Sequence, residues 1–103
     1  MAKSYAVNVT ELARQDIASI SYYIFEQSGN PDVAAKWEMS LLAKMQQLET
    51  YPRRFSSLAN RTYRKMLFGQ HLVIFRIIES EQKVRVCRVV HGARLLKNIG
   101  SIE

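Results

Sequence analysis

Residues 71–94 read HLVIFRIIESEQKVRVCRVVHGAR and set the architecture expected for the whole chain. Residues 71–78 and 83–91 are both rich in β-branched side chains, and the polar residues 79–82 between them suit a short turn. This pattern predicts a β-hairpin. The first run is apolar on both faces apart from Arg76, which is typical of a central strand that is covered on both sides.

Successive side chains of a regular strand point to opposite faces, so residues 83–91 are expected to divide between two faces. One face is expected to carry Val84, Val86, Arg88 and Val90. The other face is expected to carry Arg85, Cys87, Val89 and His91. Arg85 and Arg88 are therefore expected on opposite faces, and Cys87 is expected to be a small buried apolar residue.

The segments before this hairpin supply elements that could cover it. Residues 5–9 predict a short strand, and apolar side chains at helical spacing predict two helices after it. The first helix, capped by Thr10, carries Leu12, Ala13, Ile17, Ile20, Tyr23 and Ile24. The second helix, after a turn at Gly29 with Pro31 in its first turn, carries Ala34, Trp37, Leu41, Met45 and Leu48. The two form an αα-hairpin, with Trp37 and the tyrosines expected in the core.

Residues 63–68 predict another strand, which Gly69 and Gln70 connect to residue 71 by a tight turn. The expected order is β-α-α-β-β-β. This is an α+β fold, a helical hairpin packed on a small, mainly antiparallel twisted sheet, forming one domain over residues 1–103. Residues 53–61 are expected to be a loop. For residues 95–99, a short helix and an ordered tail both fit the sequence.

Charge is distributed unevenly along the chain. Residues 1–52 carry four bases against six acids, whereas residues 53–103 carry eleven bases against three acids, a balance of +8. The second half should therefore attract nucleic acid or an acidic protein segment. No apolar run approaches the roughly 20 residues that span a bilayer, and the first residues lack the apolar core of a signal peptide. A cytoplasmic location without a membrane partner is expected.

The sequence offers few groups for catalysis. It has two histidines and one cysteine, and it contains none of the common motifs for metal, phosphate or nucleophilic chemistry, so no cofactor or metal is expected. Basic side chains on the predicted strands could instead form a groove that holds phosphates or carboxylates. The candidate binding residues are Arg64, Arg76, Arg88, His91 and Arg94. For a nuclease, the candidates would be Arg64, Lys65, His91 and Arg94.

The chain resembles the RelE/ParE toxin superfamily in its element order and in several short motifs. These are residues 5–10, the ARQDI helix start at residues 13–17, Asn30-Pro31, Pro52, and the closing RVVHGAR of residues 88–94. The long helical hairpin and the closing residues are most similar to the ParE, or plasmid stabilisation, branch. The resemblance implies a toxin of a bacterial type II toxin–antitoxin module that forms a hetero-oligomer with a small antitoxin.

The resemblance implies one of two activities. RelE-like members cleave messenger RNA in the ribosomal A site with basic residues on the sheet, whereas ParE-like members bind DNA gyrase and block it. Arg94 matches a basic residue of the ribonuclease members, and Arg64 or Lys65 falls near others, but Leu72 stands where they have an arginine. We therefore expect a ParE-like binding inhibitor of gyrase rather than an enzyme. The alternatives are a ribosome-dependent messenger-RNA endoribonuclease and a non-toxic remnant that binds an antitoxin.

Overall fold

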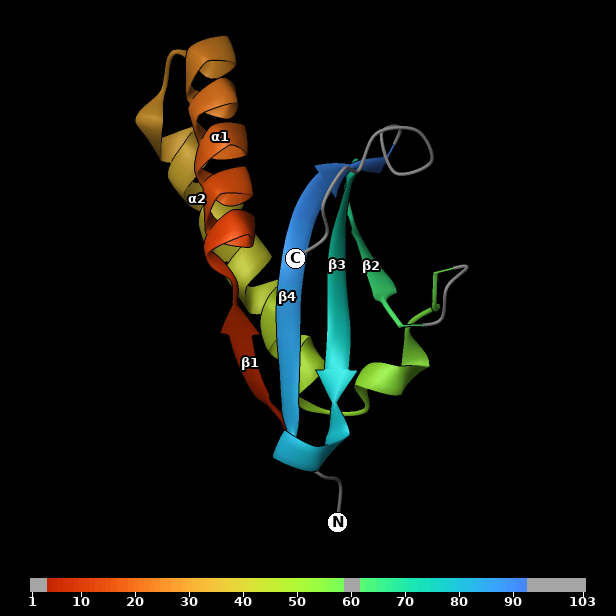
Figure 1. Cartoon of the computed structure of the whole chain (residues 1–103). Helices are drawn as coiled ribbons and strands as arrows, with labels where there is room; N and C mark the ends of the chain where they lie inside the picture. The colour runs from red at the N-terminus through yellow and green to blue at the C-terminus, as the bar shows by residue number, and fades with distance from the viewer. Residues whose placement is uncertain (1–3, 59–61, 93–103) are drawn as a thin grey trace.

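The computed structural model describes residues 4–58 and 62–92 of the chain. Within them, a helical hairpin lies against one side of a twisted sheet (Figure 1). The elements are β1 Ala6–Val9, α1 Glu11–Ser28, α2 Pro31–Gln46, β2 Arg64–Phe68, β3 His71–Ile78 and β4 Lys83–His91. Short 3-10 turns occupy Gln47–Glu49, Pro52–Arg54 and Glu79–Glu81. The α+β class and the order β-α-α-β-β-β are confirmed.

The helix ends follow the local chemistry of the sequence. The Thr10 side chain accepts a hydrogen bond from the Ala13 amide at 3.1 Å, which satisfies one of the unpaired N–H groups at the start of α1. Gly29 ends α1 in the left-handed region, with φ of 66°. Asn30 then caps α2 by accepting from the Asp32 amide at 2.9 Å, and Pro31 fills the first helical position.

The four strands are ordered β1-β4-β3-β2. β2, β3 and β4 form an antiparallel meander, and β1 pairs with β4 in parallel. The first strand of the chain therefore joins the sheet beside its last strand, and the sheet is mainly antiparallel as expected. β3 lies inside the sheet, between β4 and β2. This position agrees with the burial of residues 72–75, which belong to the run that the sequence predicts to be covered on both sides.

A β-bulge at Cys87 changes the faces that were expected for β4. Ile74 pairs with Arg88, but the next residue, Phe75, pairs with Val86, so Cys87 is the extra residue. The expectation of strict alternation is wrong beyond this point, because the extra residue reverses which side chains share a face. Arg85 and Arg88 therefore belong to the same face by register, and not to opposite faces. The expected burial of Cys87 is confirmed.

The two faces of the sheet have different apolar partners. The helix face packs against the hairpin in a buried cluster of Tyr5, Ala13, Leu41, Met45, Leu48, Met66, Val73, Phe75, Val84, Val86 and Val89. On the second face, a smaller cluster of Leu72, Ile74 and Val90 is covered by Leu58 and Tyr63. Burying this apolar area is the main stabilising contribution to the fold.

The sequence suggested that the tyrosines lie in the core, but the structure places only some of them there. Tyr5 is buried, but Tyr22, Tyr23 and Tyr51 are each more than 60% exposed. Trp37 is partly buried and packs against the main core cluster. The apolar pattern of α1 thus includes Tyr23, a residue whose side chain is mostly exposed. Tyr23 instead lines a pocket.

Candidate functional site

Asp16 joins α1 to the edge of β4. The pairing of β1 with β4 ends at Val86, so no described strand covers the second half of this edge. The Asp16 carboxylate accepts hydrogen bonds from Arg88 Nε at 2.7 Å, from Arg88 Nη2 at 3.0 Å and from the Val89 amide at 3.0 Å. The hydrogen bonds to Asp16 raise the pKa of Arg88. Arg88 is therefore held in a bidentate ion pair that anchors the helix.

Arg64 also has structural contacts. Its Nη1 donates to the carbonyl oxygen of Phe55 at 2.6 Å and to that of Arg53 at 3.2 Å. The backbone amide of Lys65 donates to the carbonyl oxygen of Ser56 at 2.9 Å. These contacts hold the segment after α2 against β2, so the Arg64 guanidinium is engaged by backbone oxygens.

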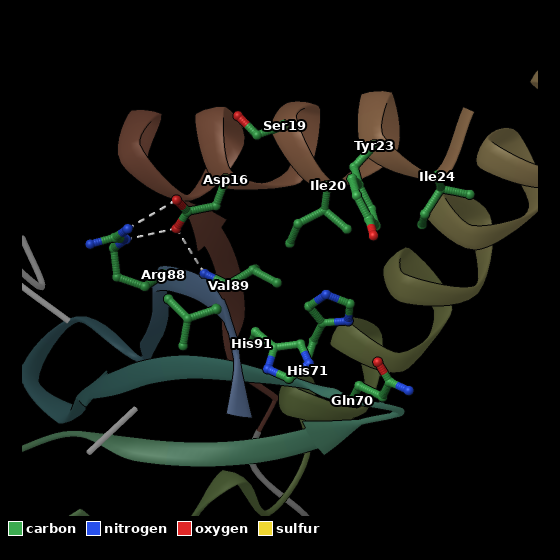
Figure 2. A pocket seen from close by; sticks show the side chains of 11 residues that line it. Asp16, Ser19, Ile20, Tyr23, Ile24, Gln70, His71, Arg88, Val89 and His91 are labelled. Carbon is green, nitrogen blue, oxygen red and sulfur yellow. Dashed lines mark hydrogen bonds and ion pairs between the residues drawn. The ribbon is translucent and has the colours of Figure 1, made fainter. Parts of the chain in front are cut away.

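A pocket of about 780 Å³ lies between α1 and the adjoining ends of β3 and β4 (Figure 2). It is lined by Asp16, Ser19, Ile20, Tyr23, Ile24, Gln70, His71, Arg88, Val89, Val90 and His91. The Asp16–Arg88 ion pair lies at one end, isoleucines from α1 form the apolar wall, and the two histidines lie across from α1 (Figure 2). Pockets of this size are large enough for a small ligand or for side chains of a partner.

Both histidines of the chain belong to this pocket. His71 and His91 are direct cross-strand partners, and their rings lie 5.7 Å apart in an edge-to-face arrangement. The His71 ring also lies 5.7 Å from the Trp37 ring. Burial, and secondly the charge of His91, lower the pKa of His71 below its ordinary value. These surroundings thus favour the neutral form of His71.

The second face of the sheet gathers basic residues by register. Arg76 on β3 is the direct cross-strand partner of Arg85 on β4. Lys65 on β2 pairs with Ile74, which lies two residues before Arg76 on β3 and shares its face. The three side chains are partly exposed. Three basic side chains on one face give it a positive field, which attracts acidic or phosphate-bearing groups.

The predicted site residues do not converge on one point. Arg64 pairs with Phe75 and His91 with His71, so about 13 Å of β3 separates them at roughly 3.3 Å per residue. Arg64 and His91 belong to the helix face, whereas Lys65 and Arg76 belong to the second face. Arg88 binds Asp16, and Arg94 lies outside the described residues.

The sequence did not lead us to select three side chains of this pocket as site residues, namely Asp16, Tyr23 and His71. Asp16 is separated from Arg88 by 72 residues, and nothing local indicates that the two meet. Tyr23 was assigned to the core. His71 could have been found, because a histidine directly after a tight turn is expected near the end of the neighbouring strand. Its position opposite His91 then follows from the length of the hairpin.

Solved structures with the same fold include chains from toxin–antitoxin systems. A chain of the chromosomal ParDE toxin–antitoxin system from P. aeruginosa superposes with a TM-score of 0.74, at 14% identity, over 85% of this chain and 96% of that chain. A chain of the RelBE2 toxin–antitoxin complex from Mycobacterium tuberculosis gives 0.63, at 21% identity, over 88% and 94%. The E. coli toxin RelE, a mutant in the free state, gives 0.62, at 14% identity, over 91% and 87%.

The family is shown by the sequence itself. The model of the ParE toxin of the type II toxin–antitoxin system parDE matches residues 7–96. The chain therefore belongs to the ParE toxin family. Among curated proteins, none matches the sequence. Across the described residues, neither helix is long and apolar enough to cross a membrane.

Proposed function

We propose that this toxin acts by binding DNA gyrase and blocking its supercoiling reaction, and that a small antitoxin neutralises it. The chain belongs to the ParE toxin family, the branch for which the sequence led us to expect gyrase as the target. The observation that carries the proposal is the separation of the basic candidate residues. Cleavage of a phosphodiester by general acid–base catalysis needs its groups within hydrogen-bond reach of the same reacting atoms.

Two of the basic candidates already have partners within the fold. Arg64, a candidate for a nuclease, donates to two backbone carbonyl groups, and Arg88, a candidate for binding, pairs with Asp16. Leu72, at the position where the ribonuclease branch is expected to have an arginine, is buried in the cluster on the second face. An inhibitor that acts by binding needs no converging acid and base, so this arrangement favours that mechanism.

The antitoxin is proposed to be an acidic segment that lies on the basic half of the chain. Residues 53–103 have a balance of +8, and the second face presents Lys65, Arg76 and Arg85 by register. Opposite charges should steer the two proteins together. The association rate should therefore fall as salt rises, because the Debye length shortens from about 10 Å at 0.1 M to about 3 Å at 1 M.

Purified toxin should be tested in parallel on gyrase and on translation. We expect it to stop the supercoiling of relaxed plasmid, to leave ribosome-bound messenger RNA intact, and to lose its effect when the antitoxin is added. Codon-dependent cleavage of the messenger RNA with supercoiling unaffected would refute the proposal and favour a ribonuclease. A protein that binds antitoxin but affects neither reaction would be a non-toxic remnant.

A pair of variants tests whether the second face contacts the target. Arg76→Gln removes a charge from that face and should weaken gyrase inhibition. Arg53→Gln is the matched control, since Arg53 is exposed and pairs with Glu79 near the turn between β3 and β4. Thermal unfolding of both variants would separate loss of binding from loss of folded protein. Equal inhibition by both variants would remove the second face from the gyrase interface.

A further inference from the structure

The pocket beside α1 has one end that is rich in hydrogen-bond donors. His71 and His91 lie across the end of the sheet, Gln70 precedes them in the turn, and Tyr23 extends from α1 with its hydroxyl directed toward the sheet (Figure 2). In the described part of the chain, the side chains of Tyr23, Gln70 and His71 form no hydrogen bond to another protein group. Their donors are available to a ligand.

The rest of the pocket fits an apolar group. Ile20 and Ile24 from α1 and Val90 from β4 line the space next to the donors. The carboxylate of Asp16 lies at the other end of the pocket, where Arg88 and the Val89 amide hold it (Figure 2). Because that carboxylate is already paired, it does not compensate charge at the histidine end.

We propose that this pocket binds a carboxylate carried on an apolar body, with the carboxylate between His71, His91, Gln70 and Tyr23 and the apolar part against Ile20 and Ile24. The segment that supplies it is an acidic and apolar stretch of the antitoxin. This partner rests on the proposed function, since it requires the chain to be a toxin with an antitoxin. The charge of residues 53–103 supports an acidic occupant.

Binding of a carboxylate at this place should be coupled to protonation. An imidazolium is a stronger donor to a carboxylate than a neutral imidazole, and a bound anion would offset the two effects that lower the pKa of His71. The other titratable groups that line the pocket are Asp16 and Arg88, which pair with each other, and Tyr23. The ligand should therefore bind with uptake of a proton and bind more tightly as pH falls through the histidine range.

The pocket itself is tested with two small probes that differ in charge alone. 3-Phenylpropionate has an apolar ring and a carboxylate, and 3-phenylpropionamide is its neutral isostere. The chain has one tryptophan, Trp37, whose ring contacts His71, so its fluorescence reports both binding and protonation. We expect the acid to bind about fivefold more tightly at about pH 6 than at about pH 8, because a rise of about one unit in the pKa of one histidine on binding changes the affinity by about that factor. The amide should change less than about twofold over the same range.

Histidine variants assign the effect to its residues. His71→Gln removes the imidazole whose pKa the bound anion is expected to raise, so it should abolish most of the pH dependence of acid binding. In the unmodified protein, the pKa of His71 that its ring resonances report should rise when the acid is bound. Lys83→Gln is the control for total charge, because Lys83 lies at the opposite end of β4 and forms an ion pair with Glu81. Equal binding of acid and amide, or an unchanged pH profile in His71→Gln, would overturn the proposed carboxylate site.

The antitoxin assignment has a separate readout. Antitoxin binding to unmodified toxin should tighten as pH falls from about 8 to about 6, and His71→Gln should remove this change. If the small acid shows the expected behaviour but the pH dependence of antitoxin affinity does not depend on His71, the antitoxin is not the occupant and that part of the proposal is refuted. In that case the toxin could still inhibit gyrase and still be neutralised by the antitoxin. The proposed function would then stand, although the antitoxin would not be the occupant of this pocket.

Discussion

Removing the Asp16 carboxylate should destabilise the fold more than loss of an ordinary surface ion pair. In Asp16→Ala, the Arg88 guanidinium and the Val89 amide lose their hydrogen bonds to this carboxylate. The side chains of Asp16 and Arg88 are 15% and 17% exposed. Breaking a fully buried pair by removing one partner costs about 3–5 kcal/mol. Because some solvent reaches this pair, we expect about 2–4 kcal/mol of the free energy of unfolding to be lost.

This loss is large compared with the stability of a small domain, which is typically about 5–15 kcal/mol. Urea unfolding followed by Trp37 fluorescence measures it directly. For a chain of this size, with a urea slope of about 1–1.5 kcal/mol per M, the midpoint should fall by roughly 2 M. Arg88→Ala and the double variant complete a mutant cycle, in which the two changes should couple by about 1–3 kcal/mol.

The matched control is the exposed ion pair between Arg53 and Glu79. Its atoms are 2.9 Å apart, similar to those of the Asp16–Arg88 pair, but its side chains are 59% and 41% exposed. Arg53→Ala should therefore cost less than about 1 kcal/mol. If Asp16→Ala costs no more than Arg53→Ala, and the cycle shows no coupling, then Asp16 does not anchor α1 to the β4 edge.

Three further changes test other parts of the structure. Val86→Ala removes two methyl groups from a fully buried position and should lower the free energy of unfolding by about 2 kcal/mol in urea, whereas an effect near zero would place Val86 outside the core. The pKa of His71 is lowered in the folded state, so its neutral form contributes stability above the unfolded pKa of about 6.5, and this contribution is lost as pH falls below that value. Denaturation curves recorded above and below that pH should show the loss of stability, and His71→Gln should not show it. In Gly29→Ala the added Cβ contacts no other atom, but the alanine must adopt φ of 66°, so the free energy of unfolding should fall by about 1 kcal/mol. A variant that is stabilised in thermal unfolding would contradict the left-handed helix end.

The sequence by itself determined the elements and their order. Thr10, Gly29 and Pro31 act on their immediate neighbours, and caps and turns of this kind depend on a few adjacent dihedral angles and hydrogen bonds. The two helices and the long hairpin follow from apolar periodicity, because burial of one face requires it. The motifs shared with a toxin family extended this reading to function, and the family match confirmed the family.

Tertiary structure alone decided the faces of β4 and the make-up of the pocket. The bulge at Cys87 arises where β3, β4 and the helices are packed together, and one extra residue moves Arg88 to the face of Arg85. The contact of Asp16 with Arg88 joins groups 72 residues apart, so no local pattern encodes it. Side-chain alternation assigns faces only while register is regular, and long-range contacts depend on how every element fills the common core.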